Sequence, residues 1–300
     1  MDEYKEDIND NIASGSRKTN ISDALSETAD KIIKELSGSS HKGKKRVIDN
    51  IISFISPAGG TGVSTLVANV AQEIVSRNLS VLVIDTNICY PSQHIYFKIK
   101  QETEKKDLIS FLSGKNTVGE SIEYRGELGV LVANNRNIMD YINCDSKVIS
   151  NNMVECLERM SSLFDVILID CSNSIEYDMI NNILYRSDSI YCVWDEGINS
   201  ISNFDRLRTN MRALGIDGNR MKVILNKKTS IYYRESVFKS LNAELIEVIP
   251  FDIAVIESGL RGGIFIKNGI SNSKTSKEFV KSINRLATKI LQLGGYRDGR

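Results

Sequence analysis

The sequence predicts an α/β protein with a doubly wound, mostly parallel sheet. Short runs rich in Val, Ile and Leu alternate along the chain with longer stretches that have the apolar spacing of helices. The apolar runs are nearly continuous, as in strands that are buried on both faces of a sheet. A glycine-rich turn joins the first apolar run to the first helical stretch, and ligands of doubly wound sheets bind at this edge.

Seven strands and seven helices follow from this reading of residue 49 onward. We expect strands at 51–56, 81–85, 128–133, 166–170, 189–194, 222–226 and 245–249. We expect helices at 64–77, 107–113, 150–163, 179–185, 201–214, 232–241 and 275–293. The last helix has an apolar face made by Phe279, Ile283, Leu286 and Ile290, which indicates packing on the core. Its neighbouring basic residues leave a membrane-surface helix as the alternative.

Residues 1–48 differ from the rest of the chain and are predicted to form a flexible N-terminal arm. They are rich in Asp, Glu, Lys, Ser and Asn and contain few large apolar residues. Within the arm, 22–36 has the pattern of one short amphipathic helix. An isolated helix of this length is marginal in water, so it should pack on its own domain or on a protein partner. Residues 49–300 are predicted to form a single domain.

Composition indicates a cytoplasmic protein. The 38 Lys and Arg residues balance the 38 Asp and Glu residues, so net charge gives no attraction to nucleic acid or anionic membrane. The five cysteines are scattered without metal-ligand spacing, which favours reduced thiols. We find no signal-peptide pattern and no apolar run of membrane-spanning length.

The glycine-rich turn, residues 56–65, has the pattern of a phosphate-binding loop. Its glycines allow consecutive backbone N–H groups to converge on an anion, and the following helix adds its positive end. Ser64 stands where such a loop places its Mg²⁺-binding hydroxyl. Val63 stands where the phosphate-contacting lysine would be. The sequence leaves open that a lysine from elsewhere reaches the site.

Polar residues follow four other predicted strands at the same edge of the sheet. They are Asp85 and Asn87, Asp170, Asn226, and Asp252, which comes two residues after Pro250. Acids at strand ends often only cap loops, but four polar strand ends beside a phosphate-type loop favour a nucleotide site.

Taken in order, these segments resemble the ParA/MinD family of deviant-Walker P-loop ATPases over roughly residues 48–293. The chain is most similar to the CpaE/TadZ group, the MinD-like proteins of pilus assembly and localisation. The resemblance implies a P-loop NTPase-like fold that binds ATP or ADP with Mg²⁺. It assigns nucleotide binding to Gly59, Gly60, Thr61, Gly62, Val63, Ser64, Thr65, Asn226, Pro250 and Asp252. It assigns the metal to Ser64, Asp85 and Asp170, and catalysis with water positioning to Asp85 and Asn87.

Three departures from the family pattern weaken the expectation of ATP hydrolysis. The two family lysines are replaced by Ala58 and Val63, and the second acid of the Asp-x-Asp pair is Asn87. Phosphoryl transfer depends on positive charge placed against developing negative charge. We therefore expect weakened nucleotide binding and a pseudo-ATPase, or a very slow ATPase, that acts as a localisation or assembly factor of a pilus or secretion system. The family implies a homodimer, and partners would recruit it to a membrane or cell pole.

The alternative is an active ParA-type partition ATPase that dimerises on ATP and binds DNA non-specifically. The stretch 201–240 motivates this alternative, because it contains nine basic residues and only three acidic ones. The basic residues are Arg206, Arg208, Arg212, Arg220, Lys222, Lys227, Lys228, Arg234 and Lys239. The competing interpretation of this stretch is an ordinary solvated face.

Overall fold

The computed structural model describes residues 49–101, 106–171, 178–229, 235–268 and 273–296. The predicted N-terminal arm and its helix, residues 1–48, lie outside these described residues. So does Arg234 of the basic stretch.

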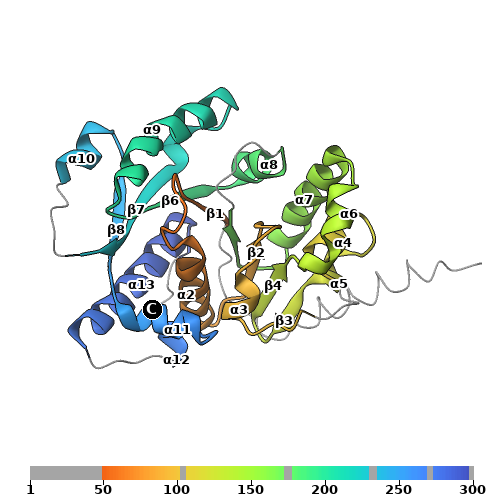
Figure 1. The fold of residues 1–300 in the computed structure, drawn as a ribbon, viewed down its shortest axis with the longest axis horizontal. Coiled ribbons are helices and arrows are strands. Elements are labelled where there is room, and N and C mark those ends of the chain that lie inside the picture. The colour runs from red at the N-terminus through yellow and green to blue at the C-terminus, as the bar shows by residue number, and fades with distance from the viewer. Residues whose placement is uncertain (1–48, 102–105, 172–177, 230–234, 269–272, 297–300) are drawn as a thin grey trace, which may run out of the picture.

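The described residues form one eight-stranded sheet in the order β3-β4-β2-β5-β1-β6-β7-β8 (Figure 1). All neighbours are parallel except β3 and β4, which are antiparallel. The strands are β1 (Ile51–Ile55), β2 (Val81–Asp85), β3 (Glu123–Arg125), β4 (Leu128–Val132), β5 (Val166–Asp170), β6 (Ser189–Trp194), β7 (Met221–Lys228) and β8 (Leu245–Pro250). The mostly parallel, doubly wound sheet that the sequence predicts is therefore confirmed.

Helices cover both faces of this sheet. They are α2 (Val63–Val75), α3 (Gln93–Tyr96), α4 (Leu108–Leu112), α5 (Val118–Ser121), α6 (Ile138–Ile142), α7 (Ser146–Ser161), α8 (Asp178–Arg186), α9 (Ile198–Ala213), α10 (Glu235–Ser240), α11 (Ile253–Leu260), α12 (Phe265–Asn268) and α13 (Lys274–Leu293). Among the described residues, none of these helices is long and apolar enough to cross a membrane.

Two apolar cores lie on opposite faces of the sheet because alternate strand side chains point to opposite sides. Phe54 packs with α2 and α13, whereas the next residue, Ile55, packs with α7, α8 and α9. Figure 1 shows α2 and α13 on one side of the row of strands and α8 and α9 on the other. Burial on both faces explains why the central strands are nearly continuous apolar runs.

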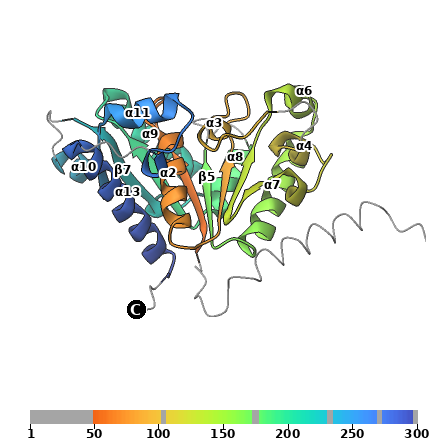
Figure 2. The ribbon, with the colours of Figure 1, turned by 90° about the horizontal axis from the view of Figure 1, so that it is seen from below.

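The strand order reverses at β1, which lies between β5 and β6. The chain leaves β1 for β2 on one side and later builds β6, β7 and β8 on the other side. Ligands bind at such a switch point, beyond the carboxyl ends of the strands. Figure 2 shows α3 and α11 at one end of the molecule and the C-terminal end of α13 at the opposite end. The loop after β1 lies at this switch point and is therefore the candidate ligand site.

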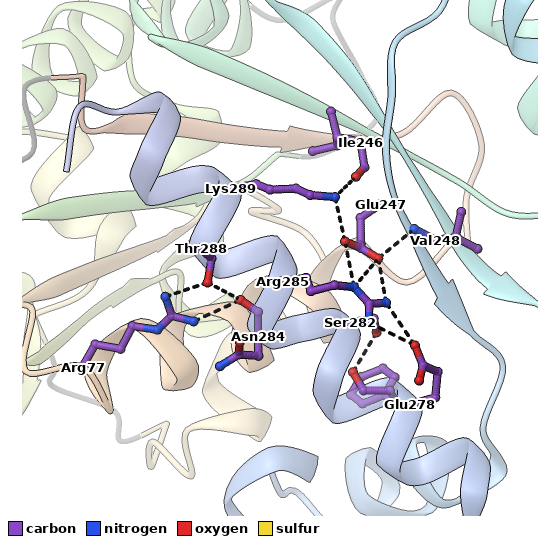
Figure 3. Close-up of polar contacts among 11 residues, drawn as sticks. Arg77, Ile246, Glu247, Val248, Glu278, Ser282, Asn284, Arg285, Thr288 and Lys289 are labelled. Carbon is purple, nitrogen blue, oxygen red and sulfur yellow. Dashed lines mark hydrogen bonds and ion pairs between the residues drawn. The ribbon is translucent and has the colours of Figure 1, made fainter. Parts of the chain in front are cut away.

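A polar cluster fixes α13 on β8, in addition to the apolar face that the sequence predicts (Figure 3). Phe279, Ile283, Leu286 and Ile290 are buried as expected. Beside them, the Glu247 carboxylate accepts hydrogen bonds from Arg285, and Lys289 donates to both this carboxylate and the Ile246 carbonyl. Arg77, which follows α2, donates to Thr288 and to the Asn284 carbonyl on α13.

Several segments differ from the sequence prediction. The short helices α3, α5, α6 and α12 were not predicted. The short strand β3, which pairs with β4 at the sheet edge, was not predicted because only three residues form it and two of them are exposed. No helix was predicted for the segment after Asp252. It forms helix α11, whose first turn is capped when the Asp252 carboxylate accepts a hydrogen bond from the Ala254 N–H.

Candidate functional site

The glycine loop after β1 has a backbone that only glycine accommodates at its tightest point. Gly60 and Gly62 have φ angles of 79° and 95°, in the left-handed region that side chains disfavour. A Cβ atom on Gly62 would lie 2.5 Å from Nδ2 of Asn226. Position 62 therefore requires glycine for two reasons: its backbone is left-handed, and Asn226 of β7 approaches it closely.

Hydrogen bonds within the chain hold the loop in this shape. The Ser56 hydroxyl accepts from the Ala58 N–H at 3.1 Å and from the Thr61 hydroxyl at 2.9 Å. From β7, the buried Asn226 amide donates to the Thr61 carbonyl at 2.8 Å. Because the loop is braced from both ends, it presents a preformed cradle to an anion.

Helix α2 starts directly after this cradle, at Val63. Its N-cap residue is Gly62, and no side chain caps the first turn. The first N–H groups of the helix therefore remain directed at the loop, as in anion sites at helix N-termini. The Val63 side chain is only 9% exposed and packs in the core with α2 and α13. A core residue thus stands directly before Ser64, where the resemblance leads us to expect a lysine.

Two buried acids, Asp85 and Asp170, lie side by side at the ends of β2 and β5, where they are paired in register. The Asp85 carboxylate accepts backbone N–H bonds from Asn87, Ser92 and Gln93. The Asp170 carboxylate accepts one from the Gln93 side-chain amide at 2.7 Å. Gln93 also donates to the Ser64 carbonyl, so it links the acids to the start of α2.

Burial dominates the protonation of this acid pair. It raises the pKa of Asp85 above its ordinary value, although three backbone N–H groups oppose the shift. Burial and the neighbouring charge of Asp85 raise the pKa of Asp170 to about 7, against hydrogen bonds from Gln93 and Ser64. Asp170 therefore titrates near neutral pH.

Two other predicted site residues have structural partners. Asn87 accepts a hydrogen bond from the Tyr90 N–H at 3.3 Å through its side-chain oxygen, and so braces its own turn. Asp252 caps α11 and accepts a hydrogen bond from the Ser276 hydroxyl on α13 at 2.5 Å. Asp252 also lines the same cavity as Thr65.

A cavity of about 360 Å³ opens beside the loop, between β7, α3 and α11. Four residues that the resemblance assigns to nucleotide binding, Thr65, Asn226, Pro250 and Asp252, line it together with Lys227, Tyr96 and apolar residues of α11. Its volume and mixed lining are those of a small-molecule site. Tyr96 was not predicted; its hydroxyl lies 2.8 Å from that of Thr65 and so joins α3 to α2.

The residues present fit a nucleotide with Mg²⁺ in most respects. The glycine cradle suits phosphates, and the Ser64 hydroxyl and Asp170 carboxylate are oxygen donors of the kind that Mg²⁺ takes alongside phosphate oxygens and water. Within the described ranges, no cluster of three or more His, Cys, Asp or Glu could hold a metal by itself. Asp85 fits the metal less well, because its two oxygens already accept three N–H groups.

The basic stretch is partly engaged within the molecule. Arg208 donates to Asp205 and to the Leu241 carbonyl, and Arg220 donates to the Tyr185 and Ser187 carbonyls. Lys222 pairs with Glu244. Lys227 donates to the Gly60 carbonyl, a contact that the sequence did not predict, although the Asn-Lys pair at a strand end was visible in it.

Known proteins resemble this chain in sequence and in structure. The septum site-determining protein MinD of Thermotoga maritima is 24% identical over 247 residues, which are 79% of this chain and 88% of that protein. The structure of MinD from Pyrococcus horikoshii complexed with Mg-ADP matches with a TM-score of 0.67 at 20% identity, over 82% of this chain and 97% of that one.

A ParA family ATPase from Chlorobium tepidum has a TM-score of 0.66 at 19% identity, over 79% of this chain and 98% of that one. The family model AAA_31, described as AAA domain, matches residues 49–220, which is more than half of the chain and includes the glycine loop. The chain therefore belongs to this AAA domain family and has the fold of the MinD and ParA ATPases.

Proposed function

We propose that this protein binds ATP or ADP with Mg²⁺ at the glycine loop, hydrolyses ATP slowly or not at all, and acts as a localisation or assembly factor. One observation carries the proposal. The loop keeps the left-handed glycines and internal bracing of a phosphate cradle, while Val63 is turned into the core at the lysine position. Such a loop retains binding geometry and lacks catalytic charge.

The roles of the chain's residues in binding follow from their positions. Backbone N–H groups of 60–65 would contact phosphate oxygens, and Ser64 with Asp170 would hold Mg²⁺. The cavity beside Asn226 and Pro250 would receive the base. When bound, the metal would neutralise phosphate charge. The MinD structure with Mg-ADP supports a nucleotide of this class, because the two folds agree over most of both chains.

Slow turnover follows from what the site lacks. Removing one donor that stabilises transition-state charge costs about 3–4 kcal/mol, by analogy with oxyanion-hole deletions. Asn87 can orient a water molecule through its amide but is a poor proton acceptor. A homodimer and protein partners of the N-terminal arm complete the proposed scaffold, and its resemblance to the CpaE/TadZ group motivates the assignment to a pilus or secretion system.

Two glycine substitutions test nucleotide binding. Both place a side chain on a left-handed residue, but only one of them also causes a clash. Gly62→Ala combines backbone strain with a clash against Asn226, whereas Gly126→Ala, in the β3–β4 turn, has a left-handed φ of 65° and no atom within 4 Å of the added Cβ. We expect calorimetry to show Mg-ADP binding to wild type and to Gly126→Ala, and at least tenfold weaker binding to Gly62→Ala. Equal binding by both variants would contradict a site at the loop.

The partition ATPase that binds DNA has less support. Four residues of the basic stretch, Arg208, Arg220, Lys222 and Lys227, already have carbonyl or carboxylate partners within the chain. A gel shift that is lost with added salt would favour DNA binding. Failure to shift DNA at low salt would remove this alternative.

A further inference from the structure

We propose that Lys227, at the end of β7, supplies the positive charge for phosphate binding that the glycine loop itself lacks. The inference rests on the proposed nucleotide site and names the residue that would grip its phosphates. Residues 56–65 contain no Lys or Arg, so any cation at the loop must come from another segment.

Lys227 already lies against the loop. Its ammonium donates a hydrogen bond of 2.5 Å to the Gly60 carbonyl. Its Cε atom would be 3.5 Å from a Cβ on Gly62, so the end of the side chain runs beside both left-handed glycines. Lys227 also lines the cavity, which places it between the phosphate cradle and the pocket for the base.

The backbone of β7 is distorted in a way that brings Lys227 to this position. In a regular strand, residues 226 and 227 would point to opposite faces of the sheet. Lys227 instead has a left-handed φ of 56°, and the pairing with β8 is irregular between Leu225 and Lys228. Asn226 and Lys227 consequently both reach the loop, at Thr61 and Gly60. Strain of this kind at a non-glycine residue is typical of functional sites.

The chemistry of lysine suits a phosphate contact in this place. An ammonium has three N–H donors, and the bond to Gly60 uses one of them. Charge-assisted hydrogen bonds to phosphate are among the strong ones. Because the charge comes from β7, it would contact the phosphates even though position 63 is a valine. Adenosine has no phosphate, so its binding would not depend on this charge.

The test compares Lys227→Met with Lys228→Met, the neighbouring lysine, which is exposed and does not line the cavity. Binding of Mg-ATP, Mg-ADP and adenosine to the full chain is measured by calorimetry. We expect Lys227→Met to bind both nucleotides roughly tenfold to hundredfold more weakly, the loss of one charge-assisted bond, with adenosine unchanged. Lys228→Met should bind all three within twofold of wild type.

The outcomes separate this inference from the proposed function. Wild-type nucleotide affinity in Lys227→Met would overturn the role of Lys227 and leave the nucleotide site intact, whereas a wild type that binds no nucleotide would overturn both. An equal loss of adenosine and nucleotide binding would show that Lys227 only shapes the pocket, and would also overturn the inference.

A second measurement needs no variant and holds if Lys227→Met does not fold. Amine modification of the wild-type protein, read by mass spectrometry, should become several-fold slower at Lys227 when Mg-ADP is added. Lys228 serves as the internal reference, and its rate should not change. Unaltered reactivity of Lys227 at saturating Mg-ADP would overturn the inference.

Discussion

At the scale of single residues, the charge of Asp170 depends strongly on its surroundings. It is buried next to a second acid, Asp85, and both are held by Gln93. The sequence predicted both acids at strand ends, but it could not predict Gln93. A glutamine in a connecting segment carries no recognisable signal, and its role depends on how α3 packs over the acids.

The raised pKa of Asp170 predicts a pH-dependent stability. Between its ordinary value of 3.8 and about 7, the folded protein keeps a proton that the unfolded chain has lost. The free energy of unfolding should therefore fall as pH rises through this window, by up to about 1.4 kcal/mol per pH unit for one proton, and level off above it. Asp170→Asn should remove much of this slope in urea titrations between pH 5 and 8.

The control for this titration is Asp178→Asn, which removes an exposed carboxylate at the start of α8 and should keep the wild-type slope. Since the pKa of Asp85 is also raised, a smaller slope should remain in Asp170→Asn. An unchanged slope in Asp170→Asn would show that Asp170 is ionised throughout this range.

At the scale of secondary-structure elements, the docking of α13 on β8 depends on Glu247. Its side chain is 5% exposed, whereas its partners Arg285 and Lys289 are 45% and 42% exposed. Glu247→Gln should lower the free energy of unfolding by about 1–2 kcal/mol. The cost should stay below that of a fully buried ion pair, because the two cations remain accessible to water.

Glu278→Gln is the matched control for this element. Glu278 contacts the same Arg285 but is 48% exposed, so its loss should cost no more than about 0.5 kcal/mol. Chemical denaturation of both variants checks the difference. Equal destabilisation would mean that burial of Glu247 contributes nothing to the docking.

Burial also explains which elements could be predicted from the sequence. The strands at 81–85, 166–170 and 189–194 were predicted with the bounds that the structure shows, because their residues are almost all buried and apolar. Helix α11 was missed, since its exposed Ile253, Ile256 and Leu260 obscure the helical pattern. The position of Lys227 was missed because a left-handed residue and an irregular strand pairing break the period of two on which strand prediction depends.

At the scale of the whole molecule, the fold positions the proposed binding site independently of the single side chains that catalysis would need. The sheet order places the loop, both acids and the cavity at one edge through β1, β2, β5, β7 and β8. That arrangement comes from strand packing and survives changes at single loop positions. Catalytic charge depends on individual side chains, so it can be lost while the fold and the binding geometry remain.

The last prediction restores charge to the site and follows ATP turnover. A lysine at position 63 can lay its methylene stem on the apolar surface that Val63 now covers and extend its ammonium toward the loop. Asn87→Asp returns a proton acceptor beside Asp85. We expect the double variant Val63→Lys with Asn87→Asp to hydrolyse ATP on the order of a hundredfold faster than wild type, the typical effect of one transition-state donor.

The control is Val63→Met with Asn87→Asp. Its methionine is long but uncharged, so its turnover should stay near that of wild type. Wild-type turnover that is well above background and as fast as that of the lysine variant would show that this protein is an active ATPase without a loop lysine.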